Sequence, residues 1–290
     1  MSEAGRAPLG VIEVSGDDAG TFLRAQLTND VLRLGSDRHF LAAWCDAKGR
    51  AILLAQVLEQ ADDGYLLILP STLIDAVLQR LRMYVLRARV TLTDVSDRYR
   101  LAGLLGPDLP SANRLTALDD ARLLGLPPTA DGAARALWIG TADAHPPENS
   151  LNTEAPEWAL ACIDAGVPEL VGATRGLFVP QMLNLHWLLA IDFDKGCYPG
   201  QEVIARLHYR GRLTRRLHRL AWRGDEPAPG DEIIDDADRV QGTVVSAAPT
   251  AGDGGHGRLL AVLRIDGAGS ALRAGSTALE LLDLPYAPPD

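Results

Sequence analysis

The order of apolar segments in the first third of the chain constrains the fold most strongly. Two segments have helical spacing, 19–27 and 72–84, and each follows a turn or capping signal. Strand-like apolar runs surround them at 10–14, 40–44, 51–59, 65–69 and 90–95. Strands interrupted by two helices in this way are typical of an α+β unit of the split βαβ type.

The rest of the chain predicts a second α+β unit and a β domain. Strands are expected at 101–105 and 136–141 and a helix at 158–165, whereas 108–132 reads as partly helical. After Gly211, short apolar segments alternate with Gly- and Pro-rich turns, which predicts a small sandwich or barrel. The boundary between the two α+β units is not sharp, so the sequence allows them to interleave. We therefore expect an α+β fold, with both units in residues 1–210 and the β domain in 211–290.

Composition narrows the class of protein. Of 290 residues, 47% are hydrophobic and 23% charged, as in globular proteins. No apolar run has transmembrane length and the first residues do not resemble a signal peptide, so we expect a cytoplasmic protein without a membrane partner. Three cysteines without ligand spacing argue against a disulfide framework and a metal site. The net charge of −10 argues against direct nucleic-acid binding.

The octapeptide Lys-Gly-Cys-Tyr-Pro-Gly-Gln-Glu at 195–202 carries the strongest chemical signal. Only two of the 28 basic residues are lysines, Lys48 and Lys195, and both precede a glycine. A cysteine reacts as its thiolate, and a cation or a helix N-terminus lowers its pKa. Lys195 and the helix expected after Glu202 could supply both influences to Cys197. The alternative is a small buried cysteine in a tight loop beside a solvated lysine.

A basic segment follows the octapeptide. Between Arg206 and Arg219 there are six arginines, two histidines and no acid. Such a segment could hold an anion, such as the glutamate tail of a cofactor, a phosphate or RNA. The alternative is a solvated face of a helix and a strand, which is the usual role of a run of charges.

In order and spacing, the octapeptide and its flanking segments resemble the YgfZ family of folate-binding proteins, relatives of the glycine-cleavage T-protein (aminomethyltransferase). The motif Lys-Gly-Cys-Tyr-x-Gly-Gln-Glu is specific to the YgfZ branch, because the T-protein branch lacks its cysteine. The resemblance covers nearly the whole chain, through segments 22–31, 46–50, 163–168, 178–185, 205–211, 242–246 and 284–286.

The resemblance implies a ring of two α+β domains and a C-terminal barrel, with tetrahydrofolate or another reduced folate in a central channel. It also implies an accessory protein that supports assembly, repair or maintenance of iron–sulfur enzymes, including those that thiomethylate tRNA. Folate and iron–sulfur client proteins would then be its partners.

The same resemblance suggests site residues by motif match. Cys197 and Lys195 would be the reactive pair. The other signature residues are Gly196, Tyr198, Gly200, Gln201 and Glu202. The residues expected to bind folate are Gln181, Asn184, Arg206, Asn29 and Lys48.

One departure from the T-protein pattern leaves the activity open. T-proteins carry a Gly-Tyr-Thr-Gly-Glu segment whose glutamate holds the pterin, and the corresponding region near 138–143 has none. Pterin recognition must therefore differ. A folate-dependent one-carbon (aminomethyl) transferase and a non-catalytic folate sensor or scaffold stay as alternatives to the accessory role.

Overall fold

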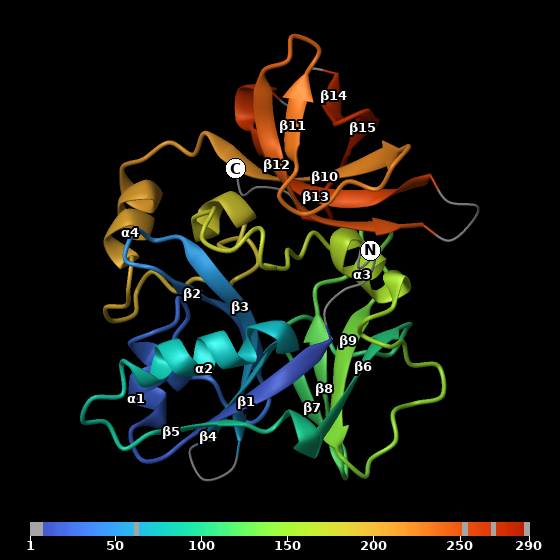
Figure 1. The fold of residues 1–290 in the computed structure, drawn as a ribbon. Coiled ribbons are helices and arrows are strands. Elements are labelled where there is room, and N and C mark those ends of the chain that lie inside the picture. Colours follow the sequence, from blue (N-terminus) through green and yellow to red (C-terminus); the bar gives the residue numbers. More distant parts are fainter. Residues whose placement is uncertain (1–7, 61–63, 251–254, 268–270, 287–290) are drawn as a thin grey trace.

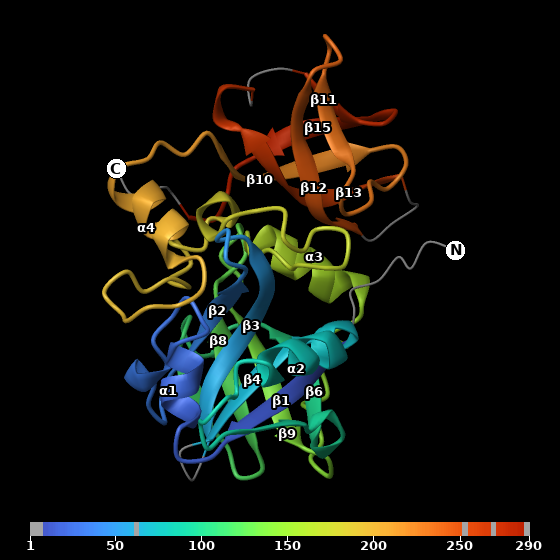
Figure 2. The same ribbon diagram turned by 60° about the vertical axis from the view of Figure 1, so that its left-hand side comes forward.

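The computed structural model describes residues 8–60, 64–250, 255–267 and 271–286. Two antiparallel sheets lie side by side in one half of the molecule and a β-barrel occupies the other, with helical and irregular segments between them (Figures 1 and 2). This arrangement confirms the predicted α+β class with a C-terminal barrel.

The first sheet contains the five strands predicted from alternation. Its strand order is β2-β3-β4-β1-β5, with β1 Leu9–Ser15, β2 His39–Cys45, β3 Ala51–Gln60, β4 Gly64–Pro70 and β5 Thr91–Asp94. The helices α1 Ala19–Arg24 and α2 Ile74–Arg82 bury Leu23 and Val77 in its core. Two 3-10 turns, η1 Val31–Arg33 and η2 Ser71–Leu73, accompany them. The first helix ends at Arg24, three residues earlier than expected, because residues 25–28 bend toward β2.

The second sheet corrects one expectation. Its order is β6-β9-β8-β7, with β6 Tyr99–Leu105, β7 Leu115–Ala117, β8 Ala121–Leu126 and β9 Arg135–Thr141. The prediction of partly helical structure at 108–132 was wrong, since this segment forms β7 and β8. Pairing of β8 with β9, from Ala121 opposite Gly140 to Leu126 opposite Arg135, outweighs local helix propensity. The short η3 Ser96–Arg98 joins the two sheets.

A shared core fixes the two sheets to each other. Val11 and Leu66 of the first sheet pack with Leu124 and Leu137 of the second and with Trp158 of α3, Pro156–Asp164. The strands of the two units do not interleave, but the chain after α3 returns to the first sheet, where the Ala51 N–H donates to the Phe178 carbonyl. Irregular segments, rather than strands, therefore join the two units.

The C-terminal part closes into a six-stranded barrel. The strand order is β10-β13-β12-β11-β14-β15, with β10 Arg215–Arg223, β11 Glu232–Asp235, β12 Val240–Pro249, β13 His256–Arg264, β14 Leu272–Ala274 and β15 Thr277–Leu282. Because the sheet closes on itself, this domain is a barrel rather than the sandwich that the sequence also allowed. The three-residue β14 was too short to predict, and a 3-10 turn, η5 Ile265–Gly267, precedes it. Within the described residues, no helix has the length and apolar character needed to cross a membrane.

An ion-pair network joins α3 to the barrel. Asp164, at the end of α3, accepts hydrogen bonds from Arg219 of β10, at 3.1 Å, and from Arg258 of β13. The Asp164 and Arg219 side chains are only 13% and 10% exposed. Because a partly buried charge that loses its partner is costly, this network should hold the barrel against the α+β half.

We predict that Asp164→Asn lowers the free energy of unfolding by about 2–4 kcal/mol, since two arginines lose their carboxylate. Urea denaturation followed by circular dichroism gives the value. The matched control is Asp266→Asn, which breaks an exposed pair with Arg264 and should leave the urea midpoint unchanged. Equal midpoints for the two variants would show that the α3 network does not hold the barrel.

Candidate functional site

The octapeptide forms a loop that leads into α4, Gln201–Tyr209. It lies beside two segments from the first unit, the end of α1 and the tip of the β2–β3 hairpin (Figures 1 and 2). A 3-10 turn, η4 Pro180–Leu183, packs on the other side of α4. The structure therefore brings together the N-terminal and central segments that were matched separately in the sequence.

The Lys195 side chain is the anchor of this loop. Its Nζ donates to the carbonyl of Arg24 and, at 2.5 Å, to that of Leu27. The ammonium also lies 4.5 Å from the centre of the Tyr198 ring. Carbonyls at the C-terminal end of a helix lack intrahelical partners and carry partial negative charge, so α1 offers an ammonium a favourable site. The two carbonyls therefore account for a buried ammonium at this position.

Burial has an electrostatic cost at Lys195, which is only 5% exposed. Desolvation lowers the pKa of Lys195 from 10.5 to about 8, nearby Arg24 adds to this effect, and Asp30 opposes it. Between pH 8 and 10.5 the unfolded chain therefore holds this proton more tightly than the folded one. The contribution of this group to stability rises as the pH increases through that range.

Two glycines allow the backbone of the octapeptide to contact the backbone of the β2–β3 hairpin directly. Gly200 has φ 79°, and a Cβ there would lie 2.4 Å from the Gly49 Cα and 2.5 Å from the Asp46 carbonyl oxygen. Gly49 has φ 73° and faces Val203 of α4. The Asp46–Gly49 turn is closed by the Asp46 side chain, whose Oδ1 accepts from the Lys48 N–H. Any side chain at position 200 would push the hairpin away.

Cys197 is the exposed thiol of the chain's three cysteines, whereas Cys45 and Cys162 are buried. Burial raises the pKa of the Cys45 thiol far above its usual range. Among the described residues, the hydrogen-bond partners of Lys195 Nζ are the two α1 carbonyls rather than the Cys197 sulfur. Lys195 thus holds the loop that presents Cys197, and α4 begins four residues later at Gln201.

The residues expected to bind folate divide into two groups. Gln181 Nε2 donates to the Ile204 carbonyl at 2.7 Å and Asn184 Nδ2 to the Leu217 carbonyl at 3.0 Å, so both amides join η4 to α4 and β10. Asn29 Nδ2 donates to the Leu189 carbonyl at 2.8 Å, six residues before the octapeptide. These three side chains support the local backbone.

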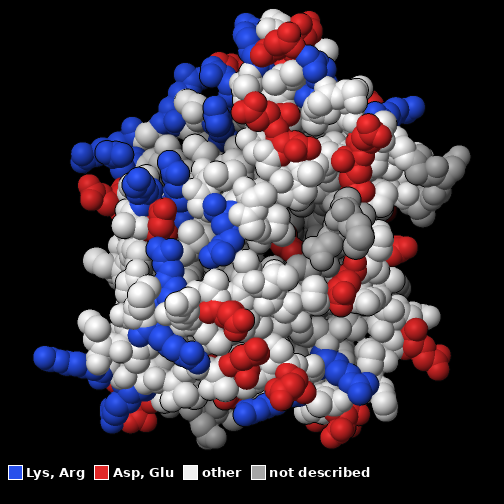
Figure 3. Space-filling model, in the orientation of Figure 1, with Lys and Arg blue, Asp and Glu red and all other residues white. Residues whose placement is uncertain are grey.

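Lys48 and Arg206 are exposed instead, as is the signature residue Glu202. Figure 3 shows Lys and Arg side chains gathered on the side where Figure 1 places α4 and the start of β10. Gln201 begins α4, and its N–H donates to the Tyr198 carbonyl.

Sequence reasoning missed the polar residues that hold this loop from the N-terminal side. Thr28 Oγ1 donates to the Ala190 carbonyl at 2.7 Å and accepts from the Ala43 N–H at 2.8 Å. Asp30 is buried and accepts from Arg24 Nε at 3.1 Å. The signal was the polar triplet at 28–30, of which we had named only Asn29 as a site residue.

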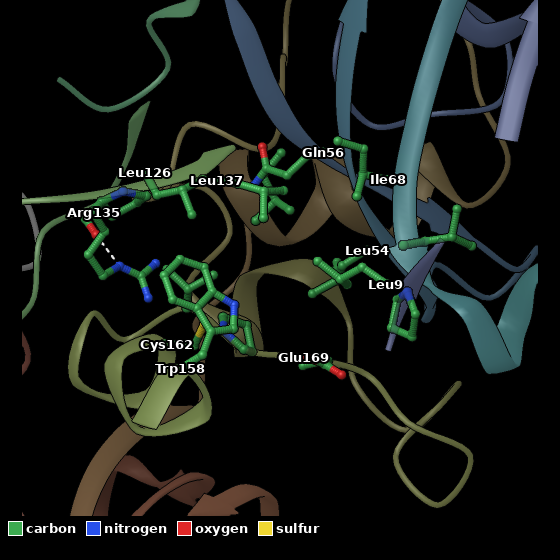
Figure 4. A pocket seen from close by; sticks show the side chains of 16 residues that line it. Leu9, Leu54, Gln56, Ile68, Leu126, Arg135, Leu137, Trp158, Cys162 and Glu169 are labelled. Atoms are coloured by element: carbon green, nitrogen blue, oxygen red, sulfur yellow. Dashed lines mark hydrogen bonds between the residues drawn. The ribbon is translucent and has the colours of Figure 1, made fainter. Parts of the chain in front are cut away.

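A cavity at the centre of the molecule lies between the two sheets. Leu54 and Ile68 line it from the first sheet, Leu137 from the second, and Trp158 and Cys162 from α3 (Figure 4). The described lining includes no residue of the octapeptide and none of the basic segment. The exposed thiol and the cavity are therefore separate features.

Two side chains in this mostly apolar cavity each have a buried N–H donor without a hydrogen-bond partner among the described residues. Arg135 is 1% exposed; its Nε donates to the Pro127 carbonyl at 2.9 Å, while its Nη1 has no hydrogen-bond partner among the described residues. The guanidinium lies 5.3 Å from the Trp158 ring centre, and the Trp158 Nε1 is also buried without a partner. Figure 4 shows the guanidinium beside the indole. A buried donor without an acceptor is costly, so this corner suits a ligand that presents an acceptor.

Comparisons with known proteins agree with the fold and with the family resemblance. The GCVT N-terminal domain family matches residues 6–123. The chain is 31% identical to the tRNA-modifying protein YgfZ of Cronobacter sakazakii, over 94% of this chain and 89% of the relative. It is 34% identical to the YgfZ protein of Klebsiella pneumoniae, over 81% of this chain and 77% of the relative.

A solved structure shares the fold. The aminomethyltransferase T of the glycine cleavage system from Bartonella henselae superposes with a TM-score of 0.72, covering 98% of this chain and 85% of that one. The sequences are 14% identical, so this likeness concerns the fold alone.

We predict that Gly200→Ala costs at least about 2 kcal/mol of stability, because a strained backbone adds to a clash with the hairpin. The matched control is Gly132→Ala, which has φ 86° and no atom within 4 Å of its new Cβ. That variant should pay only the conformational cost of about 1 kcal/mol. Urea denaturation measures both, and an equal loss in the two variants would contradict the backbone contact.

We also predict that iodoacetamide alkylates Cys197 first in the native protein. Alkylation needs an accessible thiolate, and Cys45 and Cys162 are buried. Mass spectrometry of peptides from timed samples gives the order, and labelling in denaturant shows that all three thiols can react. Faster labelling of Cys45 or Cys162 in the folded protein would refute the assignment.

Proposed function

The chain belongs to the YgfZ family, and from this membership and the central cavity we propose that it is a folate-binding accessory protein of tRNA modification. The observation that carries the folate part is the pair of buried donors, Arg135 Nη1 and Trp158 Nε1, in a cavity that is otherwise largely apolar. Ligand pockets bind flat heterocycles through apolar walls and a few fixed polar groups. The cavity has a volume of about 60 Å³, so its walls would have to move apart to admit a pterin.

The lining suits a reduced folate. A pterin ring has a flat apolar face and a carbonyl and ring nitrogens at its edge. Leu54, Ile68 and Leu137 would contact the face, and Arg135 and Trp158 would donate to the edge. When bound, tetrahydrofolate would supply one-carbon or redox chemistry. The protein's own residues would orient it and exclude water from it.

The donor set differs from the glutamate of T-proteins. Arg135 is a cation and can only donate, so it favours an acceptor or an anionic edge rather than the amino group of a pterin. The cavity also contains a carboxylate, Glu169, but it lies outside the region near 138–143 where the Gly-Tyr-Thr-Gly-Glu segment is missing. The missing segment counts against the aminomethyl transferase alternative. The lining residues lie between Leu9 and Glu169, which supports a folate-binding region within residues 1–210 and a separate barrel domain at 211–290.

We assign the second part of the function to the octapeptide. Cys197 is exposed, and Lys195, Gly200 and Gly49 fix the loop that presents it. A thiol held on the surface can react with, or transiently ligate, a group on another protein. We propose that the partners are iron–sulfur proteins of the cytoplasm, including those that thiomethylate tRNA, and that their maintenance is the accessory role. A purely non-catalytic folate sensor would have no use for an anchored exposed thiol.

We predict that tetrahydrofolate binds with a micromolar dissociation constant and that Arg135→Met weakens binding at least about tenfold, since its unpaired donor is lost. Calorimetry gives the affinities. The control is Arg122→Met on the neighbouring strand, because Arg122 does not line the cavity. Quenching of tryptophan fluorescence in the unaltered protein keeps the test valid if Arg135→Met misfolds. If tetrahydrofolate produced no heat and no saturable quenching, that result would contradict the folate site.

We further predict that Cys197→Ser fails to restore thiomethylated tRNA nucleosides in a strain lacking the native gene, while Cys45→Ala restores them. Cys45 serves as control because it is buried and does not line the central cavity. Mass spectrometry of digested tRNA gives the nucleoside levels, and immunoblotting confirms equal expression. Full restoration by Cys197→Ser would leave a folate sensor or scaffold as the better account.

A further inference from the structure

The C-terminal half of α4 and the residues that follow it carry aromatic side chains between arginines. We define the α4 face as Phe193, Arg206, His208, Tyr209, Arg210 and Arg212. The described structure exposes all of these except Phe193, which is partly buried, and Tyr209 is 65% exposed. We propose that the α4 face binds a single-stranded segment of RNA.

The aromatic side chains of the α4 face are already packed together. The rings of Phe193 and His208 are stacked, with centroids 3.7 Å apart and planes 12° apart. The Tyr209 ring stands edge-on to both, at 71° to Phe193 and 75° to His208. An exposed ring held in place by its neighbours offers an unpaired base a surface on which to stack, whatever the base.

The arginines of the α4 face are available for phosphates. Among the described residues, no ion pair joins Arg206, Arg210 or Arg212 to a carboxylate. On the barrel, by contrast, Arg264 is held by Asp266 and Arg273 by Asp238. Arginines without ion-pair partners on a protein surface can bind the backbone phosphates of a nucleic acid and displace its counterions.

A cleft beside the aromatic group could hold a base. It has a volume of about 480 Å³, and Phe193, His208 and Tyr209 form one wall. Arg38 and Asn113 contribute to its lining. Its acids, Asp30, Asp192 and Asp194, would repel phosphates, although Arg33 neutralises Asp192 at 2.8 Å. We therefore place the base toward the cleft and the backbone along the arginines.

Two observations favour RNA over the glutamate tail of a folate. No residue of the α4 face lines the central cavity, and a glutamate chain has no ring to stack on Tyr209. The net charge of −10 argues only against general nucleic-acid binding, because phosphate binding depends on the local charge. The choice of RNA over DNA rests on the proposed role in tRNA modification.

The test measures fluorescence anisotropy of a fluorescein-labelled oligouridylate of about 12 nucleotides with the full chain at low salt. We expect micromolar binding that weakens as salt increases. The triple change Arg206→Gln, Arg210→Gln, Arg212→Gln should weaken binding at least about tenfold and reduce the salt dependence. Tyr209→Ala should weaken it at least about fivefold with the salt dependence unchanged, and Tyr209→Phe should retain it.

The matched control is the triple change Arg87→Gln, Arg100→Gln, Arg223→Gln, which removes the same charge from exposed positions outside the α4 face. It should leave binding within about twofold of the unaltered protein. Absence of binding, an equal loss in the two triple variants, or unchanged binding by Tyr209→Ala would overturn the proposal. Displacement of the RNA by a hexaglutamate peptide, together with unchanged binding by Tyr209→Ala, would indicate a polyanion site instead. Tetrahydrofolate binding is measured in the same variants, so that a failure of the RNA proposal can be distinguished from a failure of the folate site.

Discussion

The contact between the Lys195 ammonium and the end of α1 determines where the octapeptide can lie. Arg24 and Leu27 offer two carbonyls that the helix itself cannot use, and Lys195 satisfies both. Burial of the ammonium lowers its pKa to about 8, so the contact is kept despite an electrostatic cost. Thr28 donates to the Ala190 carbonyl, five residues before Lys195. The loop that carries Cys197 is therefore attached to the first sheet from its start.

The close approach of Gly49 and Gly200 completes this attachment on the other side. With the hairpin against one end of the octapeptide and α1 against the other, Cys197 stays at the surface. The central cavity lies elsewhere, between the two sheets and α3, and its polar donors come from Arg135 and Trp158. The molecule thus separates the cavity from the exposed thiol, which suits an accessory protein better than a transferase that works at one centre.

Much of the fold could be predicted because it depends on local patterns. Alternating apolar residues located the strands of the first sheet and most of those of the barrel, and the octapeptide identified the family before its position was known. The strands at 115–117 and 121–126 were missed because pairing of β8 with β9 and of β7 with β8, rather than local sequence, forms them. The partners of Lys195 could not be predicted, since they are main-chain carbonyls 171 and 168 residues away. Arg135 lies directly before the strand expected at 136–141 and was not identified from the sequence.

A crystal structure of the tetrahydrofolate complex tests this account most directly. The account predicts the pterin in the central cavity, with an acceptor within hydrogen-bond distance of Arg135 Nη1 or Trp158 Nε1. It also predicts that no ligand atom contacts residues 195–202 and that the Lys195 contacts with Arg24 and Leu27 are unchanged. A folate bound against Cys197, or beside Gln181 and Asn184 with the central cavity empty, would contradict it.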